Sequence, residues 1–188
     1  FNNFSKLSDE MLGIWLKILQ QVPGSRLLLK NPYFNHAQQE RDVLRRARAV
    51  GYQPNQIEVR SATKDYLEEY QGIDIALDPY PYPGGGTTCE ALFMGIPVIT
   101  LAGKRHGTRF GYSLLMNIGL GELTADTVPE YIANAAALAQ NRDLLMALHQ
   151  QIPVLLKASP VMDGRAYTKE LEEKFQEIWQ DFYTAYTK

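Results

Sequence analysis

The sequence lacks the features that mark secreted and membrane-spanning proteins. It contains one cysteine, Cys89, in 188 residues, so no internal disulfide can form, and this suits a reducing compartment. No apolar run approaches the ~20 residues of a membrane span, and the N-terminus has no signal-peptide pattern. We therefore expect a cytoplasmic protein. The opening residues, FNNFSKLSDE, read like the middle of a longer protein, so we also expect a fragment.

An excess of positive charge is absent as well. The formal net charge is −2 and no block of Lys or Arg stands out, which argues against nucleic acid or an anionic membrane as the main partner. A catalytic thiol and a metal site are also poorly supported, because Cys89 has no basic residue nearby and no Cys/His pair has metal-ligand spacing. His36 and His149 lie in polar helical contexts and are interpreted as surface residues.

Two phosphate-binding motifs are absent. The sequence has no GxxxxGK[ST], and its glycines do not form GxGxxG after the first expected strand. A Walker loop and a standard dinucleotide-binding fold are therefore excluded.

What the sequence does contain is a regular alternation of strand and helix patterns. Short apolar runs predict strands at residues 25–29, 57–59, 73–77 and 98–101. Helical spacing predicts helices after Ser8, at 38–50, at 64–70, from the glycines to Gly95, and at 165–186. Strands that alternate with helices build parallel sheets covered on both faces. We predict one doubly wound, Rossmann-like α/β domain over residues 1–188, with a helical C-terminal tail.

The most informative stretch is DPYPYPGGGTTCEALFMGIP, residues 78–97, between an expected strand and an expected helix. In parallel α/β sheets, ligands bind at such loops beyond the carboxyl ends of the strands. Bare glycine backbone admits a ligand closely, and free N–H groups at a helix start bind anions. Gly85, Gly86, Thr87 and Thr88 are therefore candidates for phosphate contacts, and Glu90 for contacts with ribose hydroxyls. The alternative is a tight turn that needs glycine only for its geometry.

Several blocks of the chain match those of a known family. They are FNNFSK (1–6), LDPYPYPGGGTTCEALFMGIPVITLAG (77–103), SLL (113–115), GLG (119–121) and the aromatic last helix. With these blocks the chain resembles the C-terminal catalytic half of the SPINDLY and O-GlcNAc transferase family. Its members are protein O-glycosyltransferases with a two-domain GT-B fold, usually behind tetratricopeptide repeats. FNNFSK and the glycine block look more like the SPINDLY branch than the animal branch.

The resemblance implies roles for several residues at the donor diphosphate. Lys6 falls where the family places a catalytic lysine, whose charge would neutralise the departing nucleoside diphosphate, and Asn3 falls beside it. Gly86, Thr87 and Thr88 match a His-Thr-Thr segment, so Gly86 departs from the animal enzyme, and Glu90 matches a ribose-binding acid. For Lys6 the alternative is an ordinary surface lysine.

Two further groups match less closely. Ser61, Ala62 and Thr63 align with the loop that holds the nucleobase, and Tyr66 stands where its ring can stack on the base or simply pack against the fold. His106 and Arg109 lie beyond the fourth expected strand, where they would either line the sugar or phosphate side of the cleft or cap the following helix.

The sequence therefore predicts the nucleotide-sugar-binding domain of an inverting protein O-glycosyltransferase, which transfers GlcNAc or fucose to Ser or Thr. The resemblance implies UDP-GlcNAc or GDP-fucose as donor, no metal or other cofactor, and an acceptor protein held by N-terminal repeats. The lack of an Asp-x-Asp motif agrees with the absence of metal. The alternatives are a GT-B transferase acting on a small molecule or glycan, and a non-catalytic interaction module of the same fold.

Overall fold

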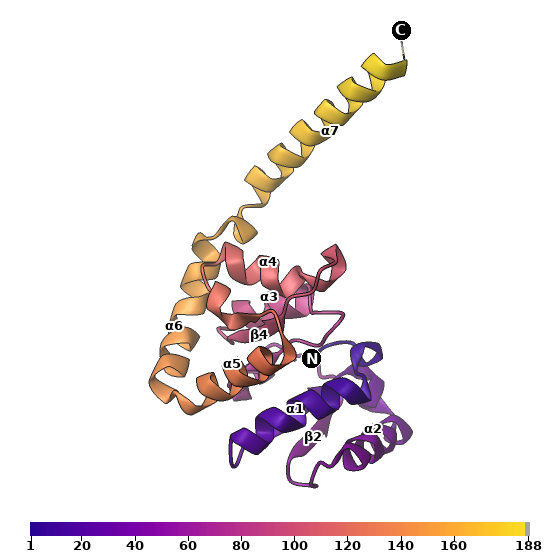
Figure 1. Cartoon of the computed structure of the whole chain (residues 1–188), viewed down its shortest axis with the longest axis vertical. Coiled ribbons are helices and arrows are strands. Elements are labelled where there is room, and N and C mark those ends of the chain that lie inside the picture. Colours follow the sequence, from indigo (N-terminus) through magenta and orange to yellow (C-terminus); the bar gives the residue numbers. More distant parts are fainter. Residues whose placement is uncertain (187–188) are drawn as a thin grey trace.

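The structure, a computed structural model, describes residues 1–186 and consists of short parallel strands between helices (Figure 1). Strand β1 (Leu27–Lys30) pairs in parallel with β2 (Ile57–Arg60), and β3 (Ala76–Leu77), β4 (Val98–Leu101) and β5 (Thr124–Ala125) form a second parallel sheet in that order. The predicted parallel α/β architecture is confirmed. The strands are nevertheless hydrogen-bonded in two groups, and β5 was not predicted because two residues are too few to show a hydrophobic period.

Seven α-helices surround the strands in the described part of the chain. They are α1 (Asp9–Gln21), α2 (Ala37–Val50), α3 (Gly86–Phe93), α4 (Phe110–Asn117), α5 (Val128–Gln140), α6 (Arg142–Ala158) and α7 (Gly164–Tyr186). Ser8 caps α1 by accepting a hydrogen bond of 3.0 Å from the Met11 N–H, and Gly51 ends α2 with a φ of 117°. The helix predicted at 64–70 is instead a turn followed by the 3₁₀ helix η3 (Glu68–Gly72).

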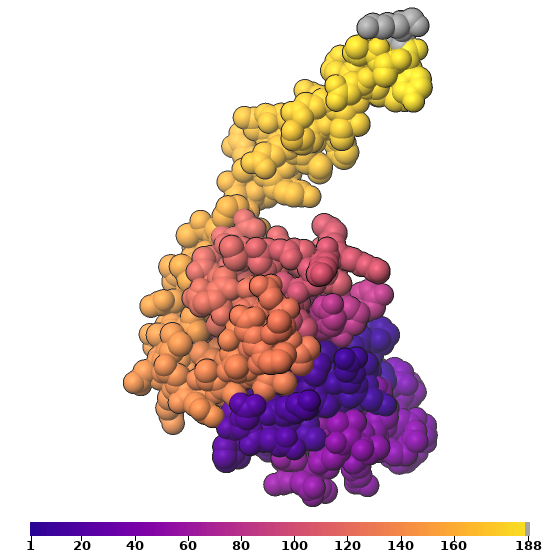
Figure 2. Space-filling view, viewed as in Figure 1, coloured from indigo at the N-terminus to yellow at the C-terminus, as the bar shows by residue number. Residues whose placement is uncertain are grey.

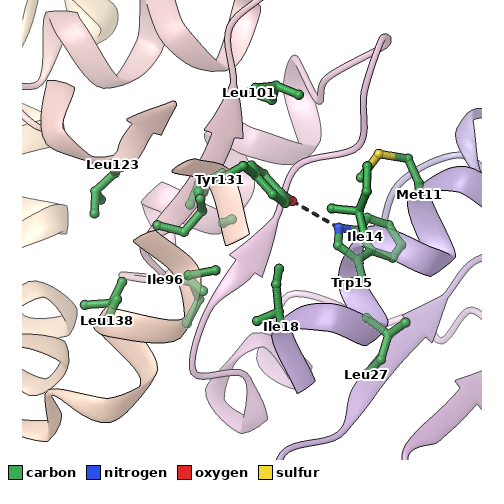
Figure 3. Close-up of a cluster of buried hydrophobic side chains, with 14 of the residues drawn as sticks. Met11, Ile14, Trp15, Ile18, Leu27, Ile96, Leu101, Leu123, Tyr131 and Leu138 are labelled. Carbon is green, nitrogen blue, oxygen red and sulfur yellow. Dashed lines mark hydrogen bonds between the residues drawn. The ribbon is translucent and has the colours of Figure 1, made fainter. Parts of the chain in front are cut away.

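The hydrophobic core lies between the helices and the strands. Helices α3, α4 and α5 pack against β4, and α1 packs against α5 (Figure 1). Between α1 and α5 the buried indole N–H of Trp15 donates a 3.0 Å hydrogen bond to the hydroxyl of Tyr131 (Figure 3), and that hydroxyl donates to the backbone carbonyl of Asp78 at 3.0 Å. A chain of hydrogen bonds thus runs from α1 to the end of β3, where the candidate site begins.

Helix α7 projects from this body, connected through η6 (Pro160–Met162) (Figures 1 and 2). All of its 23 residues are exposed, including the large apolar residues Leu171, Phe175, Ile178, Trp179 and Phe182. Within residues 1–186, the length and hydropathy needed to cross a membrane do not occur together in any helix.

Candidate nucleotide-binding site

The glycine loop occupies the position that the sequence predicts for it. It follows Asp78 at the carboxyl end of β3 and leads into α3, which begins at Gly86. Because β3 and β4 are parallel, the carboxyl ends of both strands meet at this edge of the sheet. The N-cap residue of α3 is Gly85, which has no side chain to cap the first amide groups of the helix. Those N–H groups and the helix dipole can therefore face an anion.

The three glycines of the loop differ in what surrounds them. A Cβ built on Gly84 would lie 2.4 Å from Oγ1 of Thr88, so this position is closed by packing. Apart from the adjacent residues and the nearby backbone of α3 itself, no heavy atom of the described chain comes within 4 Å of a Cβ built on Gly85 or Gly86. Within residues 1–186 a positive φ occurs elsewhere, at Gly24, Gly51, Gly95 and Gly119. Neither packing nor a left-handed backbone explains why residue 86 is a glycine. The alternative that the glycines serve only the geometry of a tight turn therefore does not account for Gly86.

Asp78 organises this loop, although no motif in the sequence singles it out. Its side chain is buried, with Oδ1 accepting hydrogen bonds from the Gly84 N–H at 2.6 Å and the Thr88 hydroxyl at 3.4 Å, while Oδ2 accepts from the Thr100 hydroxyl at 2.9 Å. Burial raises the pKa of Asp78 to about 6, although these hydrogen bonds and the charge of Lys6 oppose the shift. An acid directly after an apolar strand and before three prolines was the available signal.

Lys6 reaches the same loop from the other end of the chain. Its Nζ donates to the backbone carbonyl of Pro83 at 2.9 Å and to Oδ1 of Asn2 at 3.3 Å. Asn3 fixes the short helix η1 (Phe4–Lys6) that carries it, because Oδ1 of Asn3 accepts from both the N–H and the hydroxyl of Ser5 at 2.9 Å. The structure thus brings Lys6 and the glycine loop together, as the resemblance implies.

A cavity of about 720 Å³ lies beside these residues. Its lining includes Asn3, Lys6, Asp78, Thr87 and Thr88. Thr88 is buried and its hydroxyl already bonds Asp78, whereas Thr87 is half-buried. Within the lining, Thr87 is therefore the better placed of the two threonines for a phosphate contact.

Glu90 lies one turn into α3 and is half-buried. Its Oε1 accepts a hydrogen bond of 2.8 Å from the hydroxyl of Tyr66, and this bond raises the pKa of the phenol. The predicted ribose-binding acid and the predicted base-stacking ring are therefore neighbours, although no prediction from the sequence paired them.

The loop 61–63 is held by a buried lysine, Lys30, which no motif in the sequence singles out either. Nζ of Lys30, at the end of β1, donates to the carbonyl of Ser61 at 2.9 Å, to the hydroxyl of Thr63 at 3.1 Å and to Glu69 at 2.7 Å. Its side chain is 3% exposed, and its hydrogen bond to Glu69 lowers the pKa of that acid. The N–H of Ala62 donates to Oδ1 of Asn35 at 3.3 Å.

Lys30 also places this loop next to the site. Ser61 and Thr63 line a second cavity of about 330 Å³, and Lys30 lines both this cavity and the larger one. Lys30 therefore belongs both to the cavity that the candidate base-binding loop lines and to the cavity beside the candidate phosphate-binding loop.

The contacts that His106 and Arg109 make lie outside the two cavities. Neither is among the described residues that line the two cavities. Arg109 donates to the carbonyl of Gly103 at 3.0 Å and lies 4.0 Å over the ring of Tyr112, while the ring of His106 meets that of Phe110 edge-on at 5.4 Å. Arg109 is the N-cap residue of α4, but its side chain makes no capping hydrogen bond. Their roles at a sugar or phosphate stay predictions.

Metal ligands do not gather at this site. Across residues 1–186, no group of three or more His, Cys, Asp or Glu side chains is arranged to hold a metal ion. The positive groups that the structure brings to the loop are Lys6 and the start of α3.

These features define a parallel α/β domain with a candidate nucleotide site at the carboxyl edge of its sheet. The model of glycosyl transferase family 41 matches residues 1–171. The chain therefore belongs to glycosyl transferase family 41, which confirms the resemblance drawn from its motifs.

Individual relatives agree with this assignment. A rice protein named probable UDP-N-acetylglucosamine–peptide N-acetylglucosaminyltransferase SPINDLY is 36% identical over 97% of this chain and 20% of its own length. A Caenorhabditis elegans UDP-N-acetylglucosamine–peptide N-acetylglucosaminyltransferase is 28% identical over 97% of this chain and 16% of its own. The structure of a Thermobaculum terrenum O-GlcNAc transferase mutant matches with a TM-score of 0.89 and 34% identity, over 96% of this chain and 35% of that one. The chain thus spans about a fifth of the length of the SPINDLY relatives.

Proposed function

We propose that this chain is the donor-binding part of a protein O-glycosyltransferase, which transfers a sugar from a nucleotide sugar to Ser or Thr of an acceptor protein. The observation that carries the proposal is the unfilled space at Gly86, at the uncapped start of α3 and in the loop whose Pro83 carbonyl accepts from Lys6. Glycine at a helix start where a side chain would fit stabilises nothing within the chain. A ligand that approaches the backbone closely accounts for it.

Each part of the site has a role toward the donor. The amide groups at the start of α3 and the Lys6 ammonium bind the diphosphate, which concentrates negative charge as the sugar leaves. Glu90 accepts hydrogen bonds from ribose hydroxyls, and the loop 61–63 with Tyr66 holds the base. The donor is UDP-GlcNAc, as in the names of the relatives, or GDP-fucose, as the SPINDLY-like motifs imply.

The reaction is an attack of the acceptor hydroxyl on the anomeric carbon, with inversion. Lys6 stabilises the charge on the leaving diphosphate through an ammonium group that needs no metal ion. We assign the acceptor protein and the catalytic base to other parts of a longer cytoplasmic enzyme, including the tetratricopeptide repeats that the resemblance implies.

Binding measurements on the chain test this proposal directly. Calorimetry with UDP, GDP, uridine and guanosine should give one nucleoside diphosphate that binds clearly more tightly than its own nucleoside, because the glycine loop and Lys6 contact only the phosphates. The preferred base identifies the donor. If neither diphosphate binds better than its nucleoside, the chain is an interaction module and the proposal is wrong.

A further inference from the structure

Asp78 is 2% exposed at the foot of the glycine loop, and the proposed function gives it no contact with the donor. We propose that Asp78 is the positioning residue of the phosphate-binding loop, and that its ionised carboxylate holds the loop in the shape that accepts the donor diphosphate. This inference rests on the proposed function of the site and adds a residue to it.

The first support is the set of hydrogen bonds around the carboxylate. Its three donors come from three different elements: the Gly84 N–H from the loop, the Thr88 hydroxyl from α3 and the Thr100 hydroxyl from β4. An ionised carboxylate only accepts, so it can bond all three at once. Protonation turns one oxygen into a donor, and the loop then loses part of its attachment to the sheet.

The second support is the space around the carboxylate. A Cβ on Gly111 of α4 would lie 2.4 Å from Oδ2 of Asp78, and a Cβ on Gly84 would lie 3.1 Å from Oδ1. The carboxylate therefore fills space that both glycines leave open, and it has little freedom to move. The backbone is fixed as well, because the Tyr131 hydroxyl donates to the Asp78 carbonyl at 3.0 Å.

The groups that face Asp78 decide how the site responds to pH. They are Lys6 from η1 and Tyr131 from α5, besides the uncharged donors. Burial raises the pKa of Tyr131, so this phenol stays neutral in weak acid. Asp78 itself, with its pKa raised to about 6 by burial, changes charge there. Donor binding should therefore be strong near neutral pH and fall as Asp78 takes up its proton.

The experiment measures the affinity of the chain for UDP-GlcNAc and GDP-fucose between about pH 5 and about pH 7.5, with folding checked by circular dichroism at each pH. Nucleotide sugars are used because a terminal phosphate itself titrates near pH 6, whereas a diphosphate esterified at both ends does not. The ionised fraction of Asp78, whose pKa is raised to about 6, increases about tenfold across this range, so the affinity for the donor should increase about tenfold as well.

Three variants separate Asp78 from other causes. Asp78→Asn should bind weakly with a flat pH profile, because its side chain cannot ionise. Thr100→Val removes a donor that lowers the Asp78 pKa, so its profile should move to higher pH while strong binding returns at the alkaline end. His149→Gln removes an imidazole on α6, outside both cavities, and should keep the wild-type profile.

The outcomes distinguish this inference from the proposed function. If wild type binds one donor but Asp78→Asn keeps the wild-type profile, the Asp78 inference is wrong and the proposed function stands. A profile that flattens in His149→Gln as well does not belong to Asp78 and also overturns the inference. If Asp78→Asn does not fold, the midpoint of Thr100→Val decides, because an unmoved midpoint contradicts the role of Asp78. Failure of wild type to bind either donor at any pH overturns both proposals.

Discussion

The hydroxyl of Tyr66 and the carboxylate of Glu90 are joined by a hydrogen bond of 2.8 Å, which connects the segment after β2 to the first turns of α3. The two sides of the candidate nucleotide site are therefore linked through the residue that we assign to the ribose. A ligand that engages Glu90 meets a carboxylate already oriented by a neighbour from another element, and such second contacts fix the geometry of binding groups.

The first prediction concerns Glu90. Glu90→Gln should weaken binding of the preferred ribonucleoside diphosphate by about 1 kcal/mol or more, because a carboxylate accepts from hydroxyls more strongly than an amide does. The 2′,3′-dideoxy analogue offers no such donors and should lose little. Calorimetry on both ligands makes the comparison, with Tyr66→Phe as a control that removes only the orienting hydrogen bond. Equal losses for both ligands would assign Glu90 to the structure of α3 instead.

The second prediction concerns the open position in the glycine loop. Gly86→Val should abolish nucleotide binding, because the added side chain obstructs the close approach of the diphosphate. The melting temperature should change little, because the surrounding chain leaves space for that side chain. Gly86→His should keep binding, since the animal branch that the chain resembles has histidine there. The matched control is Gly84→Ala, whose Cβ would lie 2.4 Å from Thr88 Oγ1 and which should lower the melting temperature. Normal binding by Gly86→Val would show that the loop does not face the phosphates.

The third prediction concerns Lys6. Lys6→Ala should weaken nucleoside diphosphate binding by about 1.5–3 kcal/mol, the usual size of a hydrogen bond to a charged group. Affinity for the nucleoside alone should hardly change, because the ammonium lies at the glycine loop and bonds Pro83. Lys104→Ala, which removes an exposed lysine from the loop after β4, serves as the control for net charge. The same loss for diphosphate and nucleoside would contradict a phosphate role.

The fourth prediction concerns stability rather than binding. The folded-state pKa of Asp78 is raised to about 6 from an ordinary value of 3.8, so protonation favours the folded state. Its contribution is fully present below pH 3.8 and is lost as pH rises through about 6. Asp78→Asn should therefore be as stable as wild type near pH 7.5 or more stable, by up to about 3 kcal/mol, and should lack this part of the pH dependence. Urea titrations at several pH values measure it, and a large loss of stability in Asp78→Asn at neutral pH would contradict it.

The sequence predicted those parts of the site whose signal is local. The glycine run, the threonines and Glu90 stand together in one motif, and FNNFSK carries Lys6, so their neighbourhood follows from strand order and resemblance. Asp78 and Lys30 were missed for a different reason. Each is a single charged residue at the end of an apolar strand, and its importance lies in partners from other elements, such as Thr100 for Asp78 and Ser61 for Lys30.

The fold was predictable to a similar degree. Ser8 marks the start of α1 because it caps the helix, and Gly51 marks the end of α2 because it adopts a left-handed backbone. The strands are marked by their short buried apolar runs. All three signals are local in the sequence. The turn at 64–67 reads as a helix because its polar and apolar residues have helical spacing, although the chain there only connects β2 to η3. The separation of the strands into two hydrogen-bonded groups depends on contacts that spacing along the chain does not encode.

The hydrogen bonds from Trp15 through Tyr131 to Asp78 give the chain an optical reporter. Of the two tryptophans, Trp15 is 5% exposed and bonded into this path, whereas Trp179 is 60% exposed on α7. Replacing Trp179 with phenylalanine would leave one buried indole whose emission depends on the Tyr131 hydroxyl, two hydrogen bonds from the foot of the glycine loop. Loop ordering by a nucleotide then becomes visible as a change in fluorescence, without any attached label.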